Sequence, residues 1–407
     1  MSRSIVVTGM GAVTPLGVSF PESWNRLVAG RDAQAPLDFF NTTGCRCHHA
    51  ASASLPPLPD LPAKTIRRLP RASRLAIPAV REALAHAGLL DAEGRSTLRE
   101  LPFSVSTTAG GMGFGEDFVR RVLAGKRSHL FSEVSRYLPQ QQVLDIQQTL
   151  GFSGHSFIVA NACASGANAI GHAADLIAAG AADCVLTGGM EALTELVFVG
   201  FDCLQATSTD RCRPFDLNRT GLLIGEAAAF LVLESAGHAQ RRGAKPLCHL
   251  TGYGHTTDFF HLTQPRPDGA ALVKAMCAAA SQAKIAPAQI GYINAHGTAT
   301  QVNDGVEAKA YGTFLGDALG SIRISSTKAA IGHTLGAAGA IEALLAIEAL
   351  RTGSLPPQLN LQTPIPEIAR ALVGDQESSP GMQHVMSVNL GFGGSNAALV
   401  FSRSASS

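Results

Sequence analysis

Two pairs of segments, far apart in the chain, repeat the same pattern. Residues 5–14 (IVVTGMGAVT) and 248–257 (CHLTGYGHTT) both place apolar residues before Thr-Gly-x-Gly and then a threonine. We interpret each as a strand that ends in a glycine turn. Residues 157–177 (FIVANACASGANAIGHAADLI) and 322–347 (IRISSTKAAIGHTLGAAGAIEALLAI) both read as strand, turn and helix. The repeats predict a duplicated fold, which limits the possible architectures more than any other feature.

Strand-like and helix-like patterns alternate along all 407 residues, which favours the α/β class with helices layered on a sheet. We place the boundary between the halves in RRGAKP (241–246) and predict two units, 1–245 and 246–407. Ligand clefts often form where two such units meet, so we expect the functional site between them.

The composition excludes several classes of protein. Hydrophobic residues make up 46% and charged residues 15%, which fits a compact enzyme and argues against disorder. Lys and Arg number 32 against 31 Asp and Glu, so the chain lacks the basic excess of a nucleic-acid-binding protein. The eight cysteines are scattered, and the cluster at 45–49 (CRCHH) is spaced too tightly for a usual zinc site. We therefore expect no nucleic-acid partner and no metal.

The sequence shows no signal for export or membrane insertion. The first residues lack the apolar run of a signal peptide. The longest apolar candidate, 329–350, is interrupted by His333, Glu342 and Glu348, so it falls short of the ~18 apolar residues of a membrane span. We expect a cytoplasmic, reduced protein with no membrane partner.

Cys163 lies between an expected buried strand (156–160) and an expected helix (164–179), among small residues. Unpaired N–H groups at the start of a helix stabilise a thiolate, so this position predicts a lowered thiol pKa. Small neighbours leave room for a long, thin substrate, and glycines let N–H groups approach an oxyanion. The arrangement suits covalent acyl transfer. The alternative is an inert, buried structural cysteine.

Two histidines favour the catalytic interpretation. His296 (AHGT) and His333 (IGHTLG) both lie at expected strand-end turns with glycine nearby. A lone histidine is usually a core residue, but two such imidazoles can donate hydrogen bonds to a carbonyl or enolate oxygen, or exchange a proton. Together with Cys163 they place three reactive side chains at the same kind of structural location.

Four motifs spread over most of the chain carry a family resemblance: ACASG at Cys163, NAHGTAT…ND at His296, SSTKAAIGHTLGAAGAIE at Lys328 and His333, and GFGGSNA at Phe392. The chain resembles the elongating, decarboxylating β-ketoacyl-(acyl carrier protein) synthases. The resemblance implies a thiolase-like fold, with duplicated α/β halves in an α-β-α-β-α layering. It also implies an acyltransferase that condenses an acyl group on Cys163 with malonyl-acyl carrier protein, giving a 3-oxoacyl chain two carbons longer. The pathway would be fatty acid or type II polyketide or polyene biosynthesis.

The resemblance assigns roles to the main site residues. Cys163 resembles the nucleophile, and His296 and His333 resemble the pair that supports loss of CO2 and stabilises the resulting enolate. Lys328 resembles the family's active-site lysine, with a structural and electrostatic role, and Glu342 stands where its carboxylate partner is expected.

Further residues take implied roles in the same way. Phe392 resembles a gating phenylalanine whose N–H would form the oxyanion hole together with that of Cys163. The others are Thr298 and Thr300 for pantetheine contact, Asp304 and Glu307 for support behind His296, and Ala109, Phe201 and Leu390 for the acyl tunnel. Helix capping or a surface location is an equal alternative for the two acidic residues.

Two of these positions depart from the family pattern. Leu390 stands where a phenylalanine is common, which predicts a different swing of the gate. Ala109, in STTAGGMGF (106–114), stands where many relatives have a larger apolar residue. An alanine there predicts a deeper tunnel that accepts longer or polyunsaturated chains. A small residue that simply packs a turn is the alternative.

The segment KTIRRLPRASR carries five positive charges, on Lys64, Arg67, Arg68, Arg71 and Arg74. Carrier proteins are acidic, so we predict that this segment docks the acyl carrier protein, as the matching segment does in the family. The alternative is a solvated helix face.

The resemblance also sets expectations for cofactors and partners. No metal or organic cofactor is implied, because phosphopantetheine arrives on the carrier protein. The family is dimeric, so we expect a homodimer or a heterodimer with a chain-length-factor-like subunit. Two other functions stay open. A coenzyme A thiolase is disfavoured because NLGFGGSNA lacks a second cysteine, and a non-catalytic or chain-length-determining partner subunit is disfavoured by Cys163.

Overall fold

The computed structural model describes residues 3–126 and 131–404, and most of its strands form one ten-stranded mixed sheet. The sheet strands are β1 (Ile5–Val13), β4 (Phe103–Ser106), β5 (Ser156–Val159), β6 (Cys184–Glu191), β7 (Ala227–Ser235), β8 (Cys248–Thr257), β9 (Ile290–Asn294), β10 (Arg323–Ser325), β11 (His384–Gly391) and β12 (Ser395–Ser402). A separate small pair is formed by β2 (Ala35–Pro36) and β3 (His49–Ala50).

Helices lie between and outside the strands. The α-helices are α1 (Phe20–Val28), α2 (Ala63–Ile66), α3 (Arg71–His86), α4 (Met112–Leu123), α5 (Phe131–Tyr137), α6 (Pro139–Leu150), α7 (Ser165–Ala178), α8 (Glu195–Cys203), α9 (Ala236–Arg241), α10 (Ala270–Ala283), α11 (Asn303–Leu315), α12 (Lys328–Ile331) and α13 (Ala338–Thr352). Short 3-10 turns include η1 (Ala162–Ala164), η4 (Leu335–Ala337) and η5 (Phe392–Gly394).

The strand order confirms the predicted duplication. One half of the sheet runs β1-β7-β6-β4-β5 and the other β8-β12-β11-β9-β10, each with antiparallel pairs first and parallel pairs last. The halves join where β1 pairs antiparallel with β8. The order therefore places β5 and β10, the strands that precede the Cys163 and Lys328 motifs, at equivalent outer positions.

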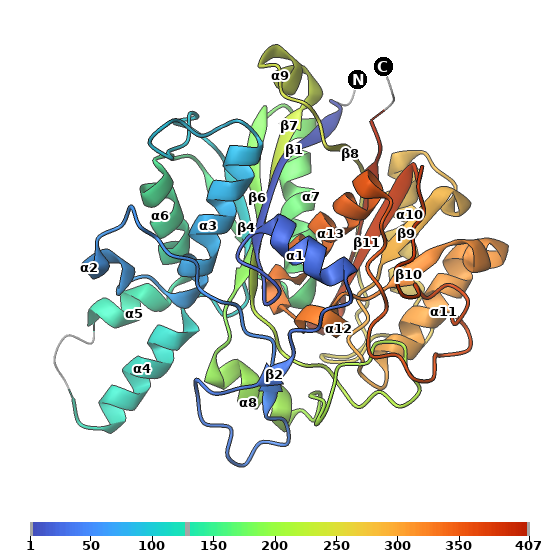
Figure 1. Cartoon of the computed structure of the whole chain (residues 1–407), viewed down its shortest axis with the longest axis horizontal. Helices are drawn as coiled ribbons and strands as arrows, with labels where there is room; N and C mark the ends of the chain where they lie inside the picture. The colour runs from blue at the N-terminus through green and yellow to red at the C-terminus, as the bar shows by residue number, and fades with distance from the viewer. Residues whose placement is uncertain (1–2, 127–130, 405–407) are drawn as a thin grey trace.

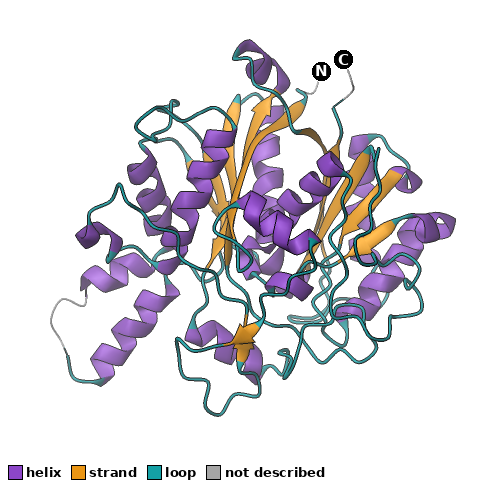
Figure 2. Cartoon of the chain, viewed as in Figure 1, coloured by secondary structure: helices purple, strands orange, loops and turns teal. Residues whose placement is uncertain are grey.

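The layering also follows the prediction. Helices α7 and α13 lie side by side between the two halves of the sheet, α3 and α6 cover one outer face, and α10 and α11 cover the other (Figures 1 and 2). Helix α13 is buried over nearly its whole length, which explains the apolar stretch at 329–350 as a core helix. Within the described residues, no helix is long and apolar enough to cross a membrane.

Small residues allow the two central helices to touch through their backbones. A Cβ atom added to Gly166 in α7 would lie 2.5 Å from the backbone nitrogen of Ala340, and one added to Gly339 in α13 would lie 2.4 Å from that of Ala167. The contact is reciprocal, as the duplication requires. It brings the start of α7, and with it Cys163, against the second half.

The predicted glycine turns after the first strand of each half are wrong. Strands β1 and β8 continue through both glycines of Thr-Gly-x-Gly. A Cβ on Gly9 or Gly11 would lie 2.2 Å from a carbonyl oxygen of α3, and a Cβ on Gly252 or Gly254 would lie 2.1 Å from one of α10. These glycines serve close helix packing on the strand rather than a turn.

The expectation of a buried strand at 156–160 is also wrong. Strand β5 is the outermost strand of its half, and within the chain it pairs only with β4. Its residues are exposed or half-buried, and Phe157 is 40% exposed. The sequence of an apolar strand does not show whether the strand is covered by its own chain or left at the edge of the sheet.

Candidate active site

Cys163 lies in a sharp turn that leads from β5 into α7. The preceding residue, Ala162, has a left-handed backbone with φ of 58°. The Ser165 hydroxyl supports this turn, because it accepts the N–H of Asn161 at 2.8 Å and donates to the carbonyl of Ala162. The turn holds Cys163 at the wall of a cavity, with only 6% of the residue exposed.

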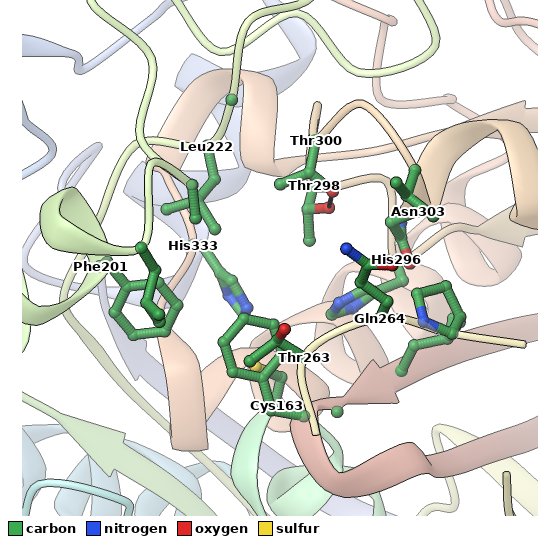
Figure 3. Close-up of a pocket in the computed structure, with 18 of the residues that line it drawn as sticks. Cys163, Phe201, Leu222, Thr263, Gln264, His296, Thr298, Thr300, Asn303 and His333 are labelled. Atoms are coloured by element: carbon green, nitrogen blue, oxygen red, sulfur yellow. Dashed lines mark hydrogen bonds between the residues drawn. The ribbon is translucent and has the colours of Figure 1, made fainter. Parts of the chain in front are cut away.

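The cavity, of about 210 Å³, brings most of the predicted site together. The imidazoles of His296 and His333 face the same space as Cys163, and their ring centres are 5.3 Å apart at 86° (Figure 3). Other predicted residues that line it are Thr298, Thr300, Phe201, Leu390 and Phe392. Residues from both halves of the sheet therefore converge on the thiol.

The loop after β9 carries His296 and is fixed from behind. Glu307 accepts the backbone N–H of His296 at 2.7 Å and that of Gly297 at 2.8 Å. The ammonium of Lys328 donates to the His296 carbonyl at 2.7 Å and lies 3.3 Å from Nδ1. Because an ammonium can only donate, Nδ1 must accept and the ring proton lies on Nε2.

His333 is held in the same tautomer by a different contact. The N–H of Leu335 donates to its Nδ1 at 3.2 Å, which leaves the proton on Nε2. That Nε2 is buried and has no hydrogen-bond partner within the described part of the chain. Burial, and then the charge of Lys328, lower the pKa of both His296 and His333 well below the usual range. The site thus presents two neutral imidazoles, whose Nε2–H groups can donate to an oxygen that gains negative charge.

Lys328 is buried and forms an ion pair with Glu342, as the resemblance implied. Glu342 also accepts a hydrogen bond of 2.6 Å from the Asn389 side chain. Burial raises the pKa of Glu342, and the charge of Lys328 opposes that rise. The pair places a fixed positive charge beside His296 without exposing it to water.

The two acidic residues behind His296 are wholly buried, so a surface location is excluded. Asp304 accepts the backbone N–H of Phe215 at 2.8 Å and that of Ala299 at 3.1 Å. Burial, with the nearby charge of Asp304, raises the pKa of Glu307 to about 7. Both carboxyls hold backbone amides around the His296 loop.

The predicted lowering of the Cys163 pKa is wrong for this closed cavity. Burial raises the pKa of Cys163 to about 11, while the charge of Lys328 and the N–H of Phe392 act in the opposite direction. Desolvation of the thiolate outweighs both. The resting nucleophile is therefore a protonated thiol.

The glycine loop between β11 and β12 packs directly against the nucleophile. A Cβ on Gly391 would lie 3.2 Å from the backbone nitrogen of Cys163. The ring of Phe392 stacks on Phe201, with centres 5.6 Å apart and planes at 26°. The expected gate thus lies at the cavity, next to Phe201 and Leu390.

Two groups of predicted residues lie elsewhere. Ala109 is buried in the turn after β4, donates its N–H to Glu191 at 2.9 Å and does not line the cavity, so its tunnel role stays a prediction. In the basic segment, Lys64, Arg67 and Arg68 are exposed, and Arg74 is half-buried.

Arg71, which the sequence groups with the docking residues, is only partly exposed. Its guanidinium forms an ion pair with the fully buried carboxylate of Glu226 and lies over the ring of Phe39, 5.2 Å from its centre. The charge of Arg71 is therefore engaged within the fold.

Sequence reasoning missed several residues of the site. Thr263, Gln264, Asn303 and Asn396 line the cavity, and Asn389 holds Glu342. The first two follow β8 in a loop without a recognisable pattern. Asn389 lies in β11, two residues before Gly391 of the glycine loop, and that position is its only signal. The described residues contain no group of three or more His, Cys, Asp or Glu side chains that could hold a metal ion.

A thiol between duplicated α/β halves, facing two neutral N–H donors, defines a condensing enzyme of the thiolase fold. The model of "Beta-ketoacyl synthase, N-terminal domain" matches residues 2–239, and that of "Beta-ketoacyl synthase, C-terminal domain" matches residues 247–362. The chain belongs to the β-ketoacyl synthase family, whose members are acyltransferases.

Relatives and solved structures agree with this assignment. The chain is 34% identical to a 3-oxoacyl-[acyl-carrier-protein] synthase 2 of Staphylococcus aureus (strain COL), over 99% of both chains. Its fold matches the ishigamide ketosynthase/chain length factor with a TM-score of 0.91 at 28% identity, over 100% of both chains. It also matches AntDE:AntF, a type II polyketide synthase acyl-carrier protein in complex with its ketosynthase, with a TM-score of 0.87 at 27% identity, over 99% of this chain and 100% of that one.

Proposed function

We propose that the protein extends an acyl chain by two carbons, through condensation of an acyl group on Cys163 with a malonyl group on an acyl carrier protein. The observation that carries the proposal is the pair of imidazoles, both fixed with Nε2–H toward the cavity that holds the thiol. Two fixed neutral donors suit an oxygen that becomes negative during the reaction.

In the first half-reaction the thiol of Cys163 attacks the carbonyl carbon of an acyl thioester. The new carbon–sulfur bond replaces the one to the carrier, and the thiol proton leaves with the carrier sulfur, so no net proton is released. The N–H of Phe392, which reaches toward the sulfur, and that of Cys163 would stabilise the oxyanion. Because the thiol proton leaves with the carrier sulfur, this step can start from a protonated thiol with a raised pKa.

In the second half-reaction the malonyl thioester loses CO2, and the bond electrons form an enolate. His296 and His333 would donate their Nε2 protons in hydrogen bonds to the thioester oxygen as it becomes negative. The enolate carbon attacks the acyl group on Cys163, a 3-oxoacyl thioester leaves, and the released thiolate takes up one proton. Each bond change uses groups of this chain and its substrates, so we propose that no metal or organic cofactor takes part.

We propose an acyl carrier protein as the partner that delivers both substrates. Thr298 and Thr300 line the cavity and hydrogen-bond to each other at 2.9 Å, in a position to contact the pantetheine arm. The exposed Lys64, Arg67 and Arg68 would attract an acidic carrier. The ketosynthase of AntDE:AntF is described with its carrier, which supports this partner.

We also propose that the chain works as a dimer along the β5 edge, with a second copy or a chain-length-factor-like subunit. Strand β5 leaves one edge unpaired within the described chain. An exposed apolar side chain lies on β5 itself, where Phe157 is 40% exposed. The ishigamide ketosynthase is described with a chain length factor, which supports the heterodimer.

The intact mass of the protein after mixing with acyl-carrier protein tests the proposal. We expect a gain of one acyl group in the natural protein and in Cys203→Ser, which changes an exposed cysteine, but none in Cys163→Ala. Equal gains in all three proteins would show that another nucleophile takes the acyl group. The absence of any gain, even with a chain-length-factor-like subunit added, would contradict the proposed reaction.

A further inference from the structure

Glu191, at the end of β6, is a fully buried carboxylate to which neither the sequence nor the mechanism above gives a role. Five hydrogen bonds reach its two oxygens, and all of the donors are neutral N–H or O–H groups. They come from two turns, one in each half of the duplicated fold. A buried carboxylate that serves two separate segments is expected to fix their relative position.

The first turn follows β4 and carries Ala109. The backbone N–H of Thr108 donates to Oε2 of Glu191 at 2.8 Å, and that of Ala109 donates to Oε1 at 2.9 Å. The hydroxyls of Thr107 and Thr108 add two more bonds. This is the turn to which the family resemblance assigns a wall of the acyl tunnel.

The second turn follows His333. The N–H of Gly336 donates to Oε2 of Glu191 at 3.0 Å, and a Cβ on Gly336 would lie 2.7 Å from that oxygen. The neighbouring Leu335 has a left-handed backbone with φ of 49°, which a leucine adopts only when its surroundings require it. The N–H of Leu335 is the group that sets the tautomer of His333.

These contacts form a continuous path from the tunnel turn to the histidine. We propose that Glu191 is a positioning residue that locks the His333 turn to the turn carrying Ala109, so that it supports decarboxylation and not the acylation of Cys163. The inference rests on the proposed function in one respect, because it takes decarboxylation as the step that His333 serves. The turn that carries Cys163 is closed by other hydrogen bonds, which join Ser165 to Asn161 and Ala162. The charge of Glu191 influences the Cys163 pKa less than burial, Lys328 and Phe392 do.

Glu191→Gln tests the proposal with a minimal change of shape. The new amide keeps one accepting oxygen, but its NH2 group would face N–H donors that it cannot accept from. Glu234→Gln is the matched control. Glu234 is also a fully buried carboxylate, but it pairs with Cys184 at the other end of β6, and its donors are Thr8, His238 and Arg242.

The two half-reactions are measured separately: acyl transfer to Cys163 by intact mass, and CO2 release from malonyl-carrier protein. We expect Glu191→Gln to slow CO2 release about tenfold, as loss of a charge-assisted hydrogen bond does, and to leave acylation within about twofold. Glu234→Gln should change neither rate by more than about twofold. An equal fall of both rates in Glu191→Gln, or unchanged CO2 release, would overturn the proposal.

Nitrogen-15 NMR of histidine-labelled protein gives a readout that needs no substrate. We expect a pure Nε2–H signal for His333 in the natural protein and a mixture of tautomers in Glu191→Gln. An identical His333 signal in both proteins would also refute the proposed role of Glu191. If the natural protein takes up no acyl group, the proposed function fails, while this spectrum still decides the role of Glu191.

Thr107→Val is a second variant that tests the role of Glu191 if Glu191→Gln does not fold. The Thr107 hydroxyl donates to Glu191 at 3.0 Å and accepts the N–H of Gly110 at 3.0 Å, so the variant loosens only the tunnel side of the lock. We expect CO2 release to fall about threefold with acylation unchanged, less than in Glu191→Gln because the other four hydrogen bonds to the carboxylate remain. A parallel fall of both rates would count against the proposal.

Discussion

The two halves of the sheet share a strand order but bring different chemistry to the same cavity. In the first half, the turn after β5 supplies a thiol among small, neutral residues. In the second half, the equivalent turn after β10 leads to a buried lysine and then to His333, and the loop after β9 supplies His296. Duplication explains why these turns meet. Their different side chains assign the covalent step to one half and the handling of charge to the other.

The two halves are also coupled electrostatically, because a charge in the second half shifts the pKa of the thiol in the first. The thiol in the first half feels the charge of Lys328 in the second, which acts against the rise of the Cys163 pKa. That charge also lowers the pKa of both histidines. One buried ammonium therefore favours the thiolate and keeps the imidazoles neutral.

Removing a histidine is the clearest test of whether the two halves serve different steps of the reaction. We expect His296→Ala and His333→Ala each to lower the condensation rate by at least about a hundredfold, as loss of a group that acts in the transition state does. Acylation of Cys163 should persist in both, because the thiol and its backbone donors are untouched. His249→Ala, on β8 and half-buried, is the control. Loss of acylation in the histidine variants would contradict the division of labour.

The acidity of the thiol gives a second contrast. A pKa of about 11 for Cys163 implies a thiolate fraction at pH 8 about two hundredfold lower than that of an ordinary thiol. Because burial raises this pKa, the rate of alkylation by iodoacetamide should rise about tenfold per unit from about pH 7 to 10, without a plateau. Mass spectrometry of the Cys163 peptide measures it, with the exposed Cys203 as a reference for reagent access. A plateau near pH 8 would show that the second half lowers the pKa more than burial raises it.

Much of this arrangement could be predicted from sequence. Cys163, His296, His333 and Lys328 lie at strand ends within motifs, and the structure places them together. Glu191 could not be predicted, because its donors are 82 to 145 residues away and no local pattern joins them. The rise of the thiol pKa could not be predicted, because a helix start is visible in the sequence and desolvation is not.

The errors about strands have a similar cause. The sequence predicts turns at the glycines of β1 and β8 because glycine weakens a strand, but here the close approach of α3 and α10 requires them. Sequence showed that α7 consists of small residues. Only the structure shows that Gly166 and Gly339 make the same contact from opposite sides.

That reciprocal contact predicts a matched effect on stability. Gly166→Ala and Gly339→Ala each add a methyl group where backbone atoms lie about 2.5 Å away. We expect each to lower the free energy of unfolding by about 1–3 kcal/mol, and the double variant to lose less than the sum. Gly312→Ala, in α11 with open space around its Cβ, should instead gain up to about 1 kcal/mol. Urea unfolding measures the free energy of unfolding of all four variants. Unequal losses in Gly166→Ala and Gly339→Ala would show that the two sides of the contact are not energetically equivalent, although their backbone geometry is alike.

The smallest expected effect concerns a feature of the first half, the exposed charges beside α2. Reversing two of them, in Arg67→Glu with Arg68→Glu, should raise the KM for carrier-bound substrates several-fold to about tenfold, because like charges then face an acidic carrier. The KM for small thioesters, which do not meet this surface, should not change. Arg71→Ala gives a different signature, since it leaves the buried carboxylate of Glu226 without its ion pair and should lower stability rather than affinity. Equal changes of KM for carrier-bound and small substrates would show that the segment shapes the cavity and does not dock the carrier. Raised salt should reproduce the effect in the natural protein, because screening weakens exposed charges more than the ion pair of Arg71 with the buried Glu226.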